Sequence, residues 1–197
     1  MTTRLRLQEL LGPILIVIAF SYVVGLQSAQ GLLIVQSTLA LFVMVLALHV
    51  FVGNSGVLSF GHGAFAMFGA FASGIVTTPS NIKENSLQLQ NLYPFLVDLN
   101  LGMYPSLLLA IAAGALVAGL SGLLLMRLNG LAAGIATFAF LGVAYNIFFY
   151  NNRIGPGSQA LLALPPFQFL EEPVVLTVIV MLAVYLFGIS HAGRTLR

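Results

Sequence analysis

The chain has 197 residues, of which 59% are hydrophobic and 6% are charged. Soluble domains carry roughly a quarter charged residues, so this composition predicts an integral membrane protein. The net charge of +2 includes no basic cluster that could bind nucleic acid, and the lack of cysteine excludes disulfides, thiolate metal sites and cysteine nucleophiles.

The first apolar run, residues 10–26, follows Arg4 and Arg6 and could be a signal peptide or a first transmembrane helix. We favour a retained helix, because residues 27–29 fit the small-x-small cleavage rule poorly and further spans follow at once. The second run, residues 32–52, has about the 20 residues that a bilayer requires.

Residues 53–78 carry no charge, yet they contain six glycines together with several polar side chains. Irregular backbone is tolerated at membrane depth only where protein or a water-filled cavity satisfies its polar groups. We therefore expect a broken or re-entrant third span at about residues 57–76, loosened at Gly61-His62-Gly63, that lies inside a bundle and lines a pathway.

Polar residues return after the third span, and residues 79–91 are expected to form a solvated loop. Residues 93–101 are apolar enough to lie along the membrane interface. Three further apolar runs predict a fourth, a fifth and a sixth span at residues 103–126, 131–150 and 174–189. The Gly- and Pro-rich residues 153–169 are expected to be ordered but irregular.

The sequence thus predicts an all-α fold, a polytopic helical membrane bundle with about six spans, and a single membrane-spanning domain over residues 1–197. Arginine placement sets the expected orientation, because cytoplasmic loops are enriched in basic residues. Five arginines fall on the side of the two termini and two basic residues on the other, so both termini are expected to be cytoplasmic. The recurrence of Ala110, Gly114, Ala118 and Gly122 every four residues predicts a helix-packing seam.

No acidic residue lies within a predicted span, although proton-coupled carriers and intramembrane proteases need ionisable groups there. Nucleotide-binding, zinc-protease and serine-hydrolase motifs are also missing from the sequence. We predict neither an enzyme nor a self-powered pump, with no catalytic residue, metal or cofactor.

His62 allows two interpretations, a neutral imidazole bonded to a neighbouring helix's backbone or a side chain that lines a polar path. Metal binding is disfavoured because no second ligand lies nearby in the sequence. The surrounding residues Asn54, Ser59, Gly61 and Gly63 form a polar, glycine-rich cluster. Freed amides at a broken helix can hold an uncharged or carboxylate-bearing solute without a charged side chain.

Residues 46–73, LALHVFVGNSGVLSFGHGAFAMFGAFAS, resemble the signature region of the membrane-spanning subunits of branched-chain amino acid ABC importers. A second block resembles the family's RGxYFAIATLAFxE pattern and loop, and the tail GRTLR is similar to GRALR. The matches are Gly53, Gly56, Ser59, Gly61, His62, Gly63, Ala64, Phe65, Gly69 and Ala70, then Gly130, Ile135, Ala136, Thr137, Ala139, Phe140 and Ser158.

The chain departs from the family at Leu141 and Gly142, where an acidic residue is frequent, and in its GPGSQAL loop. It also ends where the family normally continues into a cytoplasmic coupling segment and further spans, so we expect a truncated permease.

The resemblance implies a permease subunit of an ATP-driven importer, on the path of branched-chain or related amino acids across the inner membrane. Its implied partners are cytoplasmic ATPase subunits, a second permease subunit, an external or periplasmic solute-binding protein and membrane lipid, without nucleic acid. Alternatives are a permease or passive channel for urea or short amides, and a structural scaffold. The candidate path residues are Asn54, Ser59, Gly61, His62, Gly63 and Thr137.

Overall fold

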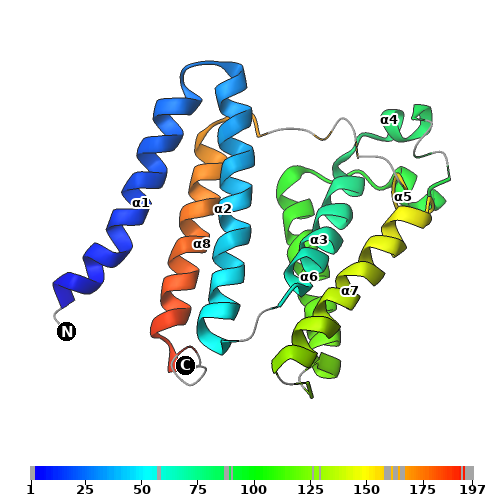
Figure 1. The fold of residues 1–197 in the computed structure, drawn as a ribbon. Coiled ribbons are helices and arrows are strands. Elements are labelled where there is room, and N and C mark those ends of the chain that lie inside the picture. Colours follow the sequence, from blue (N-terminus) through cyan, green and yellow to red (C-terminus); the bar gives the residue numbers. More distant parts are fainter. Residues whose placement is uncertain are drawn as a thin grey trace. The chain divides into compact units, whose positions relative to one another are not determined.

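The computed structural model describes residues 3–56, 59–86, 89, 91–125, 127–128, 130–157, 161, 164, 167–191 and 193. In these residues the secondary structure consists of eight α-helices and contains no strand (Figure 1). The predicted all-α class is confirmed. The chain divides into two compact units, residues 1–56 with 166–197 and residues 57–165. This division does not test the expected single membrane-spanning domain, which stays a prediction.

The first unit contains α1 (Thr3–Gly25), α2 (Ala29–Ser55) and α8 (Glu171–Ile189), and each of these helices contacts the other two. Its core is Val35 and Leu39 of α2 with Val174 of α8. The Ser28 hydroxyl caps α2 by accepting a hydrogen bond from the Gly31 N–H at 3.0 Å, as is usual for a helix N-cap. The last helix of the chain therefore packs on the first two.

The second unit contains α3 (Gly61–Thr77), α6 (Met103–Leu125) and α7 (Gly130–Tyr150), with the short helices α4 (Ser80–Asn85) and α5 (Pro94–Asp98). Helix α3 packs against both α6 and α7. It is the central helix of this unit.

The predicted small-residue seam is where α6 meets α3. A Cβ added to Gly69 would lie 3.2 Å from the Ala110 carbonyl oxygen, and one added to Gly114 would lie 3.6 Å from the Phe65 carbonyl oxygen. Positions 65 and 69 of α3 thus face positions 114 and 110 of α6, so these two helices are antiparallel. Small residues permit this close approach. The later part of the stripe differs, because a Cβ added to Gly122 would meet nothing within 4 Å.

Aromatic side chains pack α3 against α7. The Phe148 ring stacks on Phe71, with centroids 4.2 Å apart, and meets the Phe68 ring edge-on at 4.9 Å. Near the other end of α3, Leu141 of α7 lies against Gly63. Contacts therefore advance in the same direction along both helices, and α3 and α7 are parallel.

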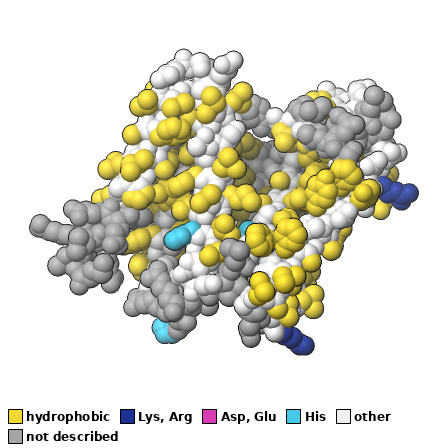
Figure 2. Space-filling model, in the orientation of Figure 1, with side chains coloured by type: hydrophobic (Ala, Val, Ile, Leu, Met, Phe, Trp, Pro, Cys, Tyr) yellow, Lys and Arg dark blue, Asp and Glu magenta, His cyan; other side chains and the backbone are white. Residues whose placement is uncertain are grey.

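Four helices among the described residues are long and apolar enough to cross a membrane, at Gln30–Asn54, Met103–Leu125, Gly130–Tyr150 and Glu171–Ile189. Their outward surfaces carry many exposed hydrophobic side chains, as lipid contact requires (Figure 2). A shorter apolar helix covers Leu11–Gly25. The helical membrane bundle is confirmed, whereas the count of six spans stays a prediction.

The expected break inside the third span is not confirmed. Gly61, His62 and Gly63 form the first turn of α3, which continues without interruption for 17 residues. At 1.5 Å per residue this helix is about 26 Å long, slightly less than the roughly 30 Å of a bilayer's hydrocarbon core. The non-helical backbone lies just before Gly61, at Gly56, Ser59 and Phe60.

The loop that follows α3 is less solvated than its composition predicts. Lys83 in α4 has no exposed surface, and its ammonium donates hydrogen bonds to the carbonyl oxygens of Leu96 at 2.8 Å and Leu99 at 2.6 Å. The last carbonyls of a helix lack partners within it, so α5 and its C-cap supply acceptors for a buried cation. Burial lowers the pKa of Lys83, and the charge of Asp98 partly opposes that shift.

Lys83 is the sole lysine of the chain, so its burial can be tested directly with an amine-reactive ester. We expect the native protein in detergent to react at its N-terminal amine and to leave Lys83 unmodified, because the reagent cannot reach a side chain without exposed surface. Denaturation should restore the reaction, as measured by peptide mass spectrometry. Equal labelling rates of Lys83 in the native and denatured states would contradict its buried position.

Candidate solute site at the start of α3

The candidate site is centred on the residues that lead into α3. Helix α2 ends at Ser55, and Gly56 follows at a φ of 66°, a left-handed conformation that glycine adopts without strain. Ser59 and Phe60 are not helical, and α3 begins at Gly61. The predicted glycine-rich cluster therefore marks a helix start.

Two hydroxyl groups hold this start in place. The Ser59 hydroxyl accepts a hydrogen bond from the Gly61 N–H at 3.3 Å. Thr137 of α7 accepts one from the Phe60 N–H at 3.1 Å and donates one to the Gly134 carbonyl at 2.9 Å. Both hydroxyl-bearing residues are buried, with 7% of Ser59 and 8% of Thr137 exposed. The α7 helix thus supplies a cap that α3 lacks in its own N-cap side chain.

His62 is half-buried in the first turn of α3. Its imidazole meets the Phe65 ring edge-on, with centroids 6.1 Å apart. The interpretation of an imidazole bonded to a neighbouring helix's backbone stays a prediction. The half-buried ring keeps the path-lining interpretation open to test.

The two glycines beside His62 have different surroundings. A Cβ added to Gly63 would lie 3.1 Å from Cδ1 of Leu141, which is closer than most real Cβ contacts. A Cβ added to Gly61 would meet its nearest atoms, in Phe65 and Ser59, at 3.5 Å, an ordinary van der Waals distance. Close packing therefore constrains Gly63 more strongly than Gly61.

Asn54 lies in α2, and so in the first unit, whereas the other five candidate residues lie in the second. Its side-chain amide donates a hydrogen bond to the Val50 carbonyl at 2.6 Å, one turn earlier in the same helix. The structure brings together Ser59, Gly61, His62, Gly63 and Thr137, and the part of Asn54 in a common site stays a prediction.

Sequence reasoning missed three contributors to this region. Phe60 provides the N–H that Thr137 accepts, and its ring meets Phe138 edge-on at 5.7 Å. Leu141 covers Gly63. Thr137 and Leu141 are four residues apart and so share a face of α7, a spacing that was visible in the sequence. What the sequence did not show was that this face meets the start of α3.

The arrangement gathers polar groups at the N-terminal end of one helix. An α-helix leaves its first N–H groups without partners inside the helix, and its N-terminus carries a partial positive charge. Hydroxyl groups and aromatic rings surround this end of α3, and His62 is the one ionisable group among the six candidate residues. Within the described residues, no group of three or more His, Asp or Glu side chains could hold a metal ion.

Comparison with known protein families decides the class. The family described as branched-chain amino acid transport system, permease component, matches residues 28–197, which include all six candidate residues. The chain belongs to this family. The permease is therefore a transport component and a multi-pass membrane protein, as the resemblance of residues 46–73 predicts. Comparisons with curated proteins and with solved structures gave no match.

Proposed function

We propose that this permease is the membrane subunit of an ATP-binding-cassette importer and carries branched-chain or related amino acids across the inner membrane, with both termini of the chain cytoplasmic. The family match over residues 28–197 carries the proposal. The site geometry adds support, because polar groups gather at the start of α3 between apolar helices.

The proposed path runs past the first turn of α3, with Ser59, Gly61, His62, Gly63 and Thr137 beside it. Asn54, in the first unit, stays a candidate path residue on the sequence alone. The positive end of α3 would attract the carboxylate of an amino acid without a charged side chain. The rings of Phe60, Phe65 and Phe138 offer apolar surface for an aliphatic side chain. A polar site beside an apolar surface suits a zwitterion with a branched hydrocarbon side chain.

The energy for import would come from partners. Transport against a gradient needs a coupled energy source, and the sequence contains no nucleotide-binding loop and no acidic residue in its predicted spans. We therefore propose that cytoplasmic ATPase subunits drive the permease, together with a second permease subunit and an external solute-binding protein.

Reconstituted vesicles test the proposal. We expect the permease with its ATPase, second permease subunit and binding protein to accumulate radiolabelled leucine only when ATP is hydrolysed. A vanadate-inhibited assembly is the matched control. ATP-independent equilibration of urea or acetamide through the permease alone would instead identify a passive amide channel and refute the proposal.

Thr137→Val tests the hydrogen bond between α7 and the segment before α3. Valine has nearly the shape of threonine but cannot accept the Phe60 N–H, and an unsatisfied buried donor costs about 1–3 kcal/mol. We expect uptake to fall about tenfold, in line with that cost, while membrane insertion is unchanged. Thr137→Ser keeps the hydroxyl and should retain most uptake. Equal uptake by both variants would show that the hydroxyl has no part in transport.

Cysteine labelling tests the proposed orientation, because the chain has no native cysteine. Glu84 in α4 and Leu128 after α6 are both exposed, and α6 separates the two ends of the second unit at which they lie. We expect Glu84→Cys to react with an impermeant maleimide applied to the outside of cells and Leu128→Cys to react only after permeabilisation. The reverse pattern would invert the topology.

A further inference from the structure

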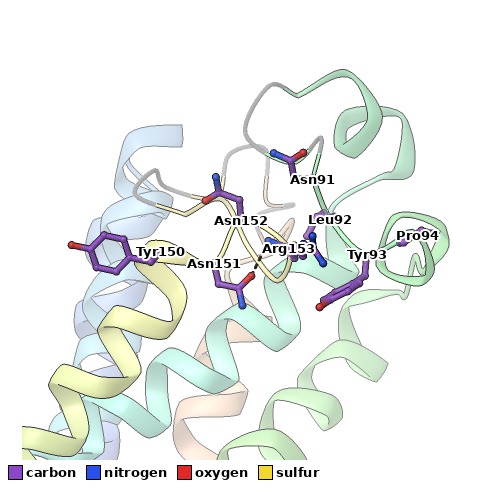
Figure 3. Close-up of a pocket in the computed structure, with 8 residues that line it drawn as sticks. All are labelled: Asn91, Leu92, Tyr93, Pro94, Tyr150, Asn151, Asn152 and Arg153. Carbon is purple, nitrogen blue, oxygen red and sulfur yellow. Dashed lines mark hydrogen bonds between the residues drawn. The ribbon is translucent and has the colours of Figure 1, made fainter.

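A polar pocket of about 610 Å³ lies in the second unit, between the segment before α5 and the turn after α7 (Figure 3). It is separate from the proposed path, because Tyr150 at the end of α7 is 13 residues beyond Thr137, or about 20 Å along the helix. The lining residues are Asn91, Leu92, Tyr93, Pro94, Tyr150, Asn151, Asn152 and Arg153.

Backbone hydrogen bonds fix the position of Arg153 in this pocket. Its N–H donates to the Asn151 side-chain oxygen at 3.1 Å, and its carbonyl accepts the Tyr93 N–H at 3.2 Å. Gly157, four residues after Arg153, has a φ of 66°, and a Cβ there would meet the Asn152 side chain. The arginine side chain is therefore presented by an ordered turn joined to the opposite wall.

The charge of the lining is positive. Arg153 is its one charged residue, and none of the eight lining residues is acidic. The guanidinium carbon lies 5.9 Å from the centre of the Tyr93 ring, a cation–π distance that orients the group (Figure 3). Three asparagines, Asn91, Asn151 and Asn152, also line the pocket. An arginine fork with neighbouring amides is suited to a phosphate or carboxylate oxyanion.

The pocket also lies just beyond a candidate membrane span. Helix α7 is long and apolar enough to cross a membrane and ends at Tyr150, so we expect the turn after it at a membrane boundary. Tyr150 is 75% exposed and Tyr93 is 40% exposed, and tyrosine favours the membrane–water interface. The planar guanidinium of an arginine matches the phosphate oxygens of a headgroup through paired donors. The volume exceeds that of a lone inorganic phosphate and can hold a larger headgroup.

We propose that this pocket binds the phosphodiester headgroup of an anionic phospholipid, with the Arg153 guanidinium as its main ligand and the asparagine amides as further donors. The proposal does not depend on the solute that the permease carries. It assigns to Arg153 a lipid-binding part that is distinct from the transport path.

Lipid retention measures this binding. The 197-residue chain is reconstituted in nanodiscs of phosphatidylcholine with a minority of phosphatidylglycerol, extracted into mild detergent and examined by native mass spectrometry. We expect the wild type to retain phosphatidylglycerol selectively. Arg153→Gln should retain about tenfold less of it, which is the effect expected from the loss of one charge-assisted hydrogen bond. Arg153→Lys should retain part of the binding. Arg127→Gln, at an exposed arginine after α6, should bind as the wild type does.

Several results would overturn the proposal. The first is retention of phosphatidylglycerol by Arg153→Gln at the wild-type level, in protein whose circular dichroism and thermal unfolding match the wild type. The second is an equal loss in Arg127→Gln. Displacement of the lipid by millimolar inorganic phosphate would assign the pocket to free anions. Unchanged lipid retention with lost stimulation by the solute-binding protein would assign it to a protein partner.

Discussion

Gly69→Val is expected to separate α3 from α6 and to lower the melting temperature of the permease in detergent more than any other single change proposed for the second unit. A Cβ at this position would lie 3.2 Å from the Ala110 carbonyl oxygen, and the two added methyl groups of valine have still less space. Backbone cannot move aside as a side chain can, so we expect a cost of about 3 kcal/mol, the upper part of the overpacking range.

Gly122→Val provides the matched control, because the same substitution on α6 meets nothing within 4 Å. Valine is not worse than glycine in a helix, so this variant should melt at or above the wild-type temperature. Gly69→Ala should give an intermediate loss, since only its Cβ must be accommodated. Thermal unfolding followed by circular dichroism orders the three. Equal melting temperatures for Gly69→Val and Gly122→Val would refute the assigned α3–α6 interface.

Gly63→Val is expected to reduce leucine uptake more than tenfold while the protein still inserts. Its Cβ would lie 3.1 Å from Leu141 Cδ1, so the Leu141 side chain must shift and the added methyl groups of valine crowd the α3–α7 contact at the proposed path. Gly61→Val should be milder, because contacts there are at ordinary distance. Overpacking costs about 1–3 kcal/mol, which is enough to lower the population of the transport-competent conformation about tenfold.

A compensating substitution makes this result specific to the contact. Leu141→Ala removes the atoms that oppose Gly63→Val, so the double variant should recover much of the lost uptake. Leu141→Ala alone should lower stability, because it deletes half-buried apolar contacts. Uptake by that single variant is therefore the reference against which the double variant is compared in a double-mutant cycle. Additive losses in the double variant would mean that Gly63 and Leu141 do not act through their contact.

The sequence by itself determined the class of the protein and the placement of most helices. Residues 103–126, 131–150 and 174–189 were predicted as spans, and α6, α7 and α8 begin and end within three residues of those bounds. The length of an apolar run is a local property of the sequence, so one sequence is enough to show which segments can cross the hydrocarbon core of a bilayer. The signature around Gly61 is likewise local, and it indicated the family before any fold was known.

Only the tertiary structure decided how these helices meet. The small residues of α6 predicted a packing seam, but not that α3 is the helix that meets it. Helices that are apolar on all sides carry no hydrophobic pattern to show which face packs inward, so the contacts of α8 were not predicted either. Thr137 caps a segment 77 residues earlier, and Lys83 is buried by carbonyls 13 and 16 residues later. The polar groups of Thr137 and Lys83 thus each have a hydrogen-bond partner that is distant in the sequence. That a buried polar group needs a partner follows from its own chemistry, but tertiary packing decides which residue the partner is.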